Sequence, residues 1–221
     1  MAFHQSTIAL GLFAFLYGNV VEATTCTNPG MTDTVRDAFL NAHNNYRSLL
    51  AKGQTQNGNF GFAPQAMNMQ KMEYDCTAEL GAIQYSGTCS GVLSDPKTRP
   101  GYKENIIEVN KLYLTNEEVA TKASDRWWRE LSKYGINRRM FFSSAVRYRT
   151  TNIVTHFAKM AWHDNVKLGC GITRCPKFFF VVCRYGPGGN IVDNFFYTQG
   201  TTCTGCPAGT TCDAATGLCG V

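Results

Sequence analysis

The ten cysteines constrain the fold most strongly, because their number is even and all of them follow residue 25. Such a set is typical of disulfide-bonded proteins that fold in an oxidising compartment. Zinc-bound thiolates are a weaker alternative. Cys203 and Cys206 form the one CxxC spacing in the sequence, whereas a zinc ribbon needs two such pairs. We therefore expect up to five disulfides and an extracellular location.

The first two dozen residues are typical of a secretory signal peptide. The run STIALGLFAFLYG is apolar but too short to span a bilayer. Val21 and Ala23 are the small residues expected before a cleavage site, although no Lys or Arg precedes the apolar run. We predict a signal peptide over residues 1–23, a secreted mature chain that begins at Thr24, and no transmembrane segment.

The charge of the chain does not indicate a nucleic-acid partner. Its formal net charge is +5 at pH 7, and this mild excess permits attraction to anionic surfaces without specifying nucleic acid. Residues 136–149 gather four arginines between aromatic residues: Arg138, Arg139, Arg147 and Arg149. This segment is expected either to bind anionic lipid headgroups or glycosaminoglycans, or to be a solvated basic loop.

The first predicted helix covers residues 32–53, with Thr32 or Asp33 as its cap and Gly53 at its end. Its apolar stripe follows three- and four-residue steps: Val35, Phe39, Ala42, Tyr46 and Leu49. His43 follows Phe39 by four residues and is therefore expected on or beside this stripe.

Periodicity and capping signals predict three more helices, in these segments: residues 75–87, 115–134 and 152–162. In the second of them Thr115 and Glu118 form a capping box. Its predicted buried face contains four residues: Ala120, Ala123, Trp127 and Leu131. Glu130 lies three residues after Trp127, so its carboxylate is expected to lean toward the core.

The run FFFVVCRY, residues 178–185, has the β-branched and aromatic content of a buried strand. Residues 168–175 are its predicted antiparallel neighbour, and residues 102–109 are a candidate third strand. Helices mixed with a few antiparallel strands predict an α+β or α-β-α layered domain.

His156 and His163 stand seven residues apart in the last predicted helix. Such residues lie about 10 Å apart along the helix axis, whereas two ligands of one zinc ion lie within roughly 4 Å of each other. The two histidines therefore cannot readily share an ion, and the HExxH pattern of metalloproteases is absent. His163 is expected at the helix end or on the surface. If His156 has a histidine partner, that partner must be His43, because the remaining histidine lies in the predicted signal peptide.

Five segments carry a family resemblance: HNNYRS, KENI, WWRE, THFAKMAW and FVVCRYGPGGNI. In this order they resemble the H-N-x-x-R, G-E-N-[IL], W-[YF]-x-E, H-[FY]-[ST]-Q-[LIVM]-x-W and C-x-Y-x-P-x-G-N elements of the CAP superfamily. That superfamily contains cysteine-rich secretory proteins, antigen 5 venom allergens and pathogenesis-related proteins. The chain departs from the pattern at Lys103, Ala158 and Lys159, where the family has Gly, Ser or Thr, and Gln. It looks most like the venom-allergen-like and activation-associated secreted proteins of parasitic nematodes.

The resemblance implies an α-β-α sandwich with a central cleft that holds two histidines and two glutamates. They fall here on His43, Glu104, Glu130 and His156. The imidazoles would bind Zn²⁺ or another divalent cation, not required for folding, and the carboxylates would orient them. The same cluster is alternatively a polar network without chemistry, or the centre of a metal-dependent hydrolase or protease. Ala158 replaces the family's candidate hydroxyl nucleophile, so we expect a non-enzymatic protein.

The resemblance also implies binding of a sterol or fatty acid, or of a host receptor protein, in an immunomodulatory role. Lipid contacts are expected from the tryptophans of helix 115–134 and from the loop of residues 57–69: Trp127, Trp128, Phe60, Phe62, Met67 and Met69. Alternatively, the tryptophans belong to the core and the loop tucks its aromatic side chains inward. The sequence specifies no oligomeric state.

The family pattern implies disulfides Cys89–Cys175 and Cys170–Cys183, which leaves Cys26 to pair with Cys76. Past Tyr197 the chain is poor in large apolar side chains and carries four cysteines: Cys203, Cys206, Cys212 and Cys219. They are expected to pair among themselves in an order that the sequence does not fix. We therefore predict a CAP domain over residues 24–200 and a disulfide-rich C-terminal extension over residues 201–221.

Overall fold

A four-stranded sheet forms the centre of the computed structural model, which describes residues 25–221. The predicted signal peptide therefore lies outside the described residues. In spatial order the strands are β1 (Glu73–Tyr74), β4 (Lys167–Arg174), β5 (Phe179–Gly186) and β2 (Lys103–Val109). β5 pairs antiparallel with both β4 and β2, and β1 pairs parallel with β4. The three predicted strands are confirmed, and β1 is an addition.

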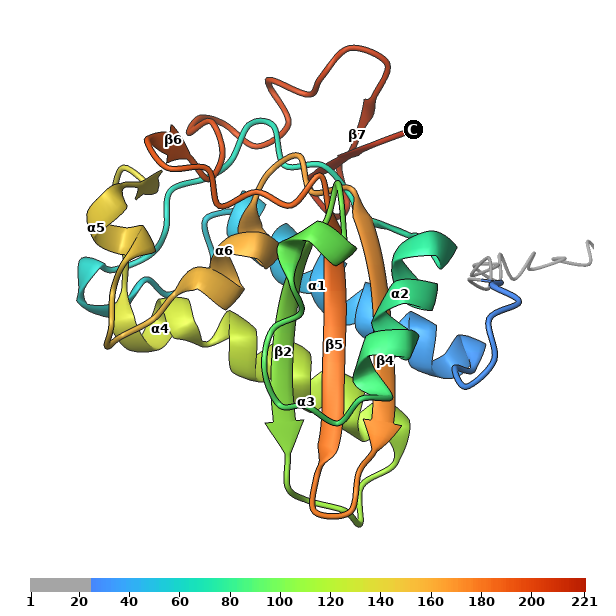
Figure 1. The fold of residues 1–221 in the computed structure, drawn as a ribbon. Coiled ribbons are helices and arrows are strands. Elements are labelled where there is room, and N and C mark those ends of the chain that lie inside the picture. The colour runs from blue at the N-terminus through green and yellow to red at the C-terminus, as the bar shows by residue number, and fades with distance from the viewer. Residues whose placement is uncertain (1–24) are drawn as a thin grey trace, which may run out of the picture.

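Helices cover both faces of this sheet (Figure 1). One face carries α2 (Cys76–Ser86), and the other carries α1 (Asp33–Ala51), α3 (Asn116–Trp128) and α6 (Thr155–Ala161). The predicted three-layer α-β-α sandwich is therefore confirmed. Among residues 25–221 no helix combines the length and the apolar character that a membrane span requires.

Shorter elements complete the domain around these layers. α4 (Glu130–Tyr134) follows α3, and α5 (Ser144–Arg147) precedes α6. β3 (Phe141–Phe142) pairs with β6 (Asn194–Phe195). η1 (Gly58–Phe60) and η2 (Pro96–Thr98) are short 3₁₀ helices.

Two glycines of β4 allow α2 to lie close against the sheet. A Cβ at Gly169 would collide with the backbone nitrogen of Glu79, and one at Gly171 would lie 2.5 Å from the backbone nitrogen of Ile83. Real Cβ contacts are longer than this, so any larger residue would push the helix off the sheet.

The helix boundaries follow local capping and backbone geometry. Thr32 caps α1 by accepting a hydrogen bond from the Val35 amide, and the predicted capping box of Thr115 and Glu118 begins α3. The predicted helix 115–134 is divided into α3 and α4 at Arg129. α6 begins later than predicted, because Asn152 has a φ of 53° that a right-handed helix excludes.

The buried row of α1 differs from the predicted apolar stripe. Leu49, which was predicted to face the core, is 42% exposed. The buried row keeps Val35 and Phe39 from the predicted stripe and adds Leu50 and two polar residues, His43 and Arg47. Burial of polar groups is tolerated only where hydrogen bonds replace those to water, and both His43 and Arg47 are supplied with such bonds.

Arg47 joins α1 to the segment before β1 and to the C-terminal end of α6. Its guanidinium donates to four carbonyl oxygens, those of Gln70, Met160, Trp162 and His163, at distances of 2.5 to 2.9 Å. A planar guanidinium with five donors suits such a convergence of carbonyls. This residue therefore fixes the end of α6 relative to α1.

All ten cysteines form disulfides, as predicted. Cys26–Cys76, Cys89–Cys175 and Cys170–Cys183 confirm the pairing expected for the domain. In the C-terminal extension, where the sequence left the pairing open, the disulfides are Cys203–Cys212 and Cys206–Cys219.

The C-terminal extension packs against the domain. Its hairpin consists of β7 (Thr211–Asp213) and β8 (Leu218–Gly220). Backbone bonds of 2.8 Å join Cys219 to Met69 and Lys71, and Ser48 of α1 donates to the Thr216 carbonyl. Leu218 is buried. The extension is therefore fastened by hydrogen bonds and apolar contact as well as by its own disulfides.

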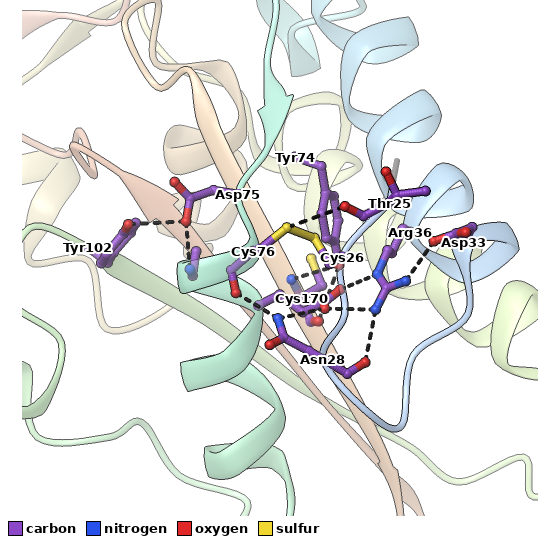
Figure 2. Close-up of a disulfide and its surroundings, with 12 residues drawn as sticks. Thr25, Cys26, Asn28, Asp33, Arg36, Tyr74, Asp75, Cys76, Tyr102 and Cys170 are labelled. Carbon is purple, nitrogen blue, oxygen red and sulfur yellow. Dashed lines mark hydrogen bonds and ion pairs between the residues drawn. A yellow bond between two sulfur atoms is a disulfide. The ribbon is translucent and has the colours of Figure 1, made fainter. Parts of the chain in front are cut away.

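The segment before α1 is fastened to α2 beside the Cys26–Cys76 disulfide (Figure 2). Arg36 of α1 forms two hydrogen bonds, of 2.7 and 2.9 Å, with the carboxylate of Glu79, and both side chains are almost fully buried. Arg36 also contacts the more exposed carboxylate of Asp33 at 2.6 Å. Asn28 donates to Glu79 and to the carbonyl of Cys76. A buried ion pair and a disulfide thus hold the same junction.

Candidate functional site

A cleft of about 930 Å³ opens beside β2, α3, α4 and the start of α6. Apolar residues on its walls include Ile107, Trp127 and Ile153. Its charged residues come mostly from α3 and α4: Lys122, Asp125, Arg126, Arg129, Glu130 and Lys133. His156 also reaches the cleft. Positive side chains outnumber negative ones on these walls, so the cleft favours an anionic ligand.

Glu130 and His156 form the polar centre of this cleft. His156 Nδ1 lies 2.6 Å from Glu130 Oε1, and Glu130 Oε2 accepts from the backbone amides of His156 and Phe157 at 3.0 Å. Because a carboxylate accepts, Nδ1 of the neutral ring carries the proton. The Trp127 ring stacks on the imidazole with centroids 6.5 Å apart. Glu130 therefore fixes both the first turn of α6 and the orientation of His156, as its predicted inward position implied.

His43 lies apart from this pair and is fully buried. Its Nδ1 donates to the Phe39 carbonyl at 2.7 Å, so Nε2 accepts from the hydroxyl of Tyr185 at 2.9 Å. Burial lowers the pKa of His43 to about 4, with a smaller contribution from the positive charge of Arg47. The ring is therefore neutral at physiological pH, and both of its nitrogens are already occupied.

Asn105 links the His43 network to α6. Its side-chain amide donates to the Tyr185 hydroxyl at 3.2 Å and to the His156 carbonyl at 3.1 Å. The two histidines are thus connected through Tyr185 and Asn105, and only the backbone of His156 takes part. Neither Tyr185 nor Asn105 was predicted as a site residue. Tyr185 could have been found as the residue two beyond Cys183 on the same inward row of the strand.

Glu104 lies on the opposite face of the sheet from Asn105. It stands across from Arg184 in the register of β2 and β5, and it accepts from Arg184 Nε at 3.3 Å. The hydroxyl and amide of Ser94 donate to it at 3.0 and 2.9 Å, and Arg99 lies 4.0 Å away. Because neighbouring side chains of a strand alternate between faces, Glu104 cannot reach His156.

The prediction that His43, Glu104, Glu130 and His156 meet in one cluster is therefore wrong. The structure brings together Glu130 and His156, hydrogen-bonds His43 to Tyr185, and turns Glu104 toward two arginines. Within residues 25–221 no three His, Cys, Asp or Glu side chains lie together as a metal-binding group. The residues present do not fit a divalent-cation site with the predicted ligands.

His163 follows the end of α6, as predicted. Its carbonyl accepts from Arg47 Nη2 and from the Gln70 amide. Burial lowers the pKa of its imidazole, and the neighbouring carboxylate of Asp164 opposes this change. Its role is to complete the set of carbonyls around Arg47.

The predicted lipid contacts do not form one groove. Met69, Trp127 and Trp128 are buried in the core, where Trp128 stacks on Tyr46 at 5.0 Å. The core alternative for the tryptophans is therefore the correct one, although Trp127 also reaches the cleft wall. The Met67 amide bonds to the Thr198 carbonyl, so the loop is held in place. The exposed members of the predicted set are Phe60 at 45% and Phe62 at 59%.

Comparisons with known proteins agree with this architecture. The model of the cysteine-rich secretory protein family, CAP, matches residues 40–185. Ancylostoma secreted protein of Ancylostoma caninum is 40% identical over 193 residues, which cover 87% of this chain and 46% of that protein. The chain thus spans about half the length of this relative. Hookworm platelet inhibitor 1 of the same organism is 26% identical over 209 residues, which cover 93% of this chain and 91% of that protein.

A solved structure also matches closely. The crystal structure of NaASP2 with Zn²⁺ superposes with a TM-score of 0.83 at 34% identity, covering 88% of this chain and all of that one. Five disulfides and secreted relatives establish an extracellular location. The family model and these relatives show that the chain belongs to the CAP family of cysteine-rich secretory proteins.

Proposed function

We propose that this protein is a secreted, non-enzymatic binding protein whose cleft receives an acidic segment of a host extracellular protein. The observation that carries the proposal is the cleft beside Glu130 and His156, where Lys122, Arg126 and Lys133 face solvent. Charges on rigid helices are already oriented for a ligand, which reduces the ordering cost of binding. The platelet inhibitor among the relatives supports a target on host cells.

The shape of the cleft supports an extended ligand. A second hollow of about 500 Å³ lies along the outer side of α3 and shares Lys122 and Asp125 with the cleft. The two hollows adjoin along α3 and together form a groove. The positive charge of this groove lies in the cleft, because the second hollow carries Glu117 and Glu118. A peptide segment lies naturally in such a groove, and a compact small molecule would fill only part of it.

We do not propose hydrolysis by a cluster of histidines and glutamates. A metal-dependent hydrolase requires several ligands around one ion, and Glu104 and His43 are committed to other partners. The position of a candidate hydroxyl nucleophile is occupied by Ala158, which is buried. The polar pair that remains serves better to shape the cleft than to activate water.

Zinc binding is expected to be weak and to depend on His156 alone. Zn²⁺ in proteins is usually held by three or four protein ligands, and the cleft offers His156 beside Glu130. A zinc titration by calorimetry should show no stoichiometric site at micromolar concentrations, and His156→Ala should remove any residual heat. His43→Gln should leave the titration unchanged. A tight one-to-one site that is lost in His43→Gln would contradict this arrangement.

Lipid binding is a second candidate, and one observation favours it. Phe60 at the end of η1 and Phe62 just after it are exposed, and exposed aromatic side chains on one short segment suit contact with an apolar ligand. The same loop is anchored by the Asn57 side chain, which bonds to Ile136. A sterol or fatty acid would therefore meet a small surface patch and not an enclosed tunnel.

The test compares binding of labelled protein to mammalian platelets and leukocytes by flow cytometry. Arg126→Glu with Lys133→Glu reverses two exposed charges of the cleft, and Lys97→Glu with Lys177→Glu makes the same charge change elsewhere. The double variant of the cleft should bind the cells at least about tenfold more weakly than the wild type, since each lost charge contact at an interface costs on the order of 1 kcal/mol or more. Binding that survives in the cleft pair but is lost with Phe60→Ser and Phe62→Ser would favour the lipid-facing loop instead.

A further inference from the structure

Two lysines that depart from the family pattern meet beside the segment after β5. Lys103, at the start of β2, donates to the carbonyls of Gly189 and Asn190, the latter at 3.3 Å. Lys159 of α6 donates to the carbonyl of Thr155 at 2.8 Å. The same carbonyl accepts from the side-chain amide of Asn190 at 3.1 Å. Both ammonium groups are therefore adjacent to Asn190: Lys103 contacts its backbone carbonyl, and Lys159 shares the Thr155 carbonyl with its side-chain amide.

The positive charge at this place is buried and poorly compensated. Lys159 is 9% exposed, and burial lowers its pKa to about 7, with further lowering by Arg147, Lys103 and Arg99 and an opposing effect from Glu130. The pKa of Lys103 is also lowered, first by burial and then by Arg147 and Arg99. Charges buried without a partner are costly.

The two glutamates of the predicted cluster are engaged elsewhere. Glu130 is hydrogen-bonded to His156, and Glu104 is held by Arg184 on the opposite face of the sheet. Across residues 25–221, neither Lys103 nor Lys159 forms an ion pair with a carboxylate. An anion from outside the chain would supply the missing negative charge.

Asn190 provides an independent sign of a missing ligand. Its side chain is 7% exposed, and its Oδ1 is buried with no hydrogen-bond partner in the described part of the chain. Buried polar atoms without partners are rare in native proteins and point to a bound water, ion or ligand. Lys159 likewise makes one hydrogen bond here and has two further N–H donors. The place thus offers several charged donors and one unused acceptor.

We propose that Lys103, Lys159 and Asn190 form a binding site for a protonated phosphate group. Phosphate oxygens would accept from the two ammonium groups, and the P–OH would donate to Asn190 Oδ1. Sulfate has no proton at neutral pH and would leave that acceptor unsatisfied. Arg147, exposed at the end of α5, would attract the anion to the site.

The site is separate from the proposed binding cleft. Within residues 25–221, the walls of that cleft include neither Lys103 nor Lys159. The predicted basic segment contributes Arg147 here, whereas Arg139 lies over the rings of Phe141 and Phe195. The anion site can therefore fail or succeed independently of the cell-binding test.

Calorimetric titration of the secreted protein with inorganic phosphate and with sulfate tests the proposal. The wild type should bind phosphate saturably and sulfate at least about tenfold more weakly, because a buried acceptor without a partner is unfavourable. Lys103→Gly with Lys159→Gln, the residues of the family pattern, should abolish phosphate binding. Lys97→Gln with Lys177→Gln makes the same charge change on exposed residues and should leave it intact.

A second arm distinguishes a free anion from a lipid headgroup. Vesicles of phosphatidylcholine with phosphatidic acid should capture the wild type if the phosphate of a lipid can enter, and the double variant should lose that capture. Phosphate binding without vesicle capture would assign the site to a free anion. The proposal is overturned if the wild type binds no phosphate, or if the double variant binds it as well as the wild type. Lys103→Gly alone, with its melting temperature measured, replaces the double variant if that fails to fold.

Discussion

Arg47→Met is expected to lower the free energy of unfolding by about 3–5 kcal/mol. The guanidinium is fully buried, and its donors satisfy the carbonyls of Gln70, Met160, Trp162 and His163. Removal of the charge recovers part of its desolvation cost, but each carbonyl left without a donor costs about 1–3 kcal/mol. The carbonyls of Trp162 and His163 keep backbone donors, from Asn165 and Gln70, but those of Gln70 and Met160 would lose the donor that the described residues give them. These two losses outweigh the gain. Unfolding by guanidinium chloride under non-reducing conditions measures the change.

Two further substitutions control for this effect. Arg138 is exposed, so Arg138→Met should change the free energy of unfolding by no more than about 0.5 kcal/mol. Arg47→Lys should also be strongly destabilising, because three donors on one ammonium cannot reach four carbonyls. If Arg47→Met unfolds at the same denaturant concentration as Arg138→Met, the guanidinium does not hold α1 and α6 together.

Glu79→Ala is expected to cost about 3–5 kcal/mol, since it removes one partner of a buried ion pair. Arg36 is 3% exposed and its two bonds to Glu79 would be lost, together with the bond from Asn28. The guanidinium would remain buried beside the disulfide that Figure 2 shows. The same denaturant titration would report this loss as a lower midpoint.

Asp33→Ala is the matched control for the same arginine. The Asp33 carboxylate also contacts Arg36, but its side chain is 42% exposed. Exposed ion pairs contribute roughly 0–1 kcal/mol, so this variant should lose far less stability than Glu79→Ala. Equal losses in the two variants would show that burial does not set the strength of these contacts.

The framework of the fold was predictable because its signals are local or covalent. The capping box at Thr115 and Glu118 and the strand predicted from the β-branched and aromatic content of FFFVVCRY agree with the structure, as do the cysteine pairs that the family resemblance implied. The break at Arg129 and the late start of α6 at Thr155 depend on single backbone angles. Periodicity does not resolve such angles, so these boundaries were displaced.

The polar site was harder to predict because it depends on which face of a strand each residue occupies. Glu104 and Asn105 are neighbours in sequence, yet a shift of one residue places them on opposite faces of β2. The sequence motif points to the carboxylate, and the structure uses the amide next to it. His43 was correctly predicted to be buried, but its partner, Tyr185, comes from a strand 142 residues later. Hydrogen bonds between residues so far apart in the sequence produce no periodic pattern that could predict them.

The stripe of α1 shows the same limitation. A pattern that counts only apolar residues selects Leu49 and omits Arg47, whereas the structure exposes the leucine and buries the arginine. The steps of four from Phe39 through His43 to Arg47 contained the correct row. Its polar members were excluded because their partners lie in distant loops.

The central claim is tested most directly by measuring the apparent affinity of the two charge-reversed double variants for host cells and comparing them. If the groove along α3 receives an acidic protein segment, Arg126→Glu with Lys133→Glu should weaken binding by at least about tenfold. Lys97→Glu with Lys177→Glu should bind as the wild type does, and added salt should reduce wild-type binding. Equal affinities of the two pairs would contradict the assignment of the cleft as the binding surface.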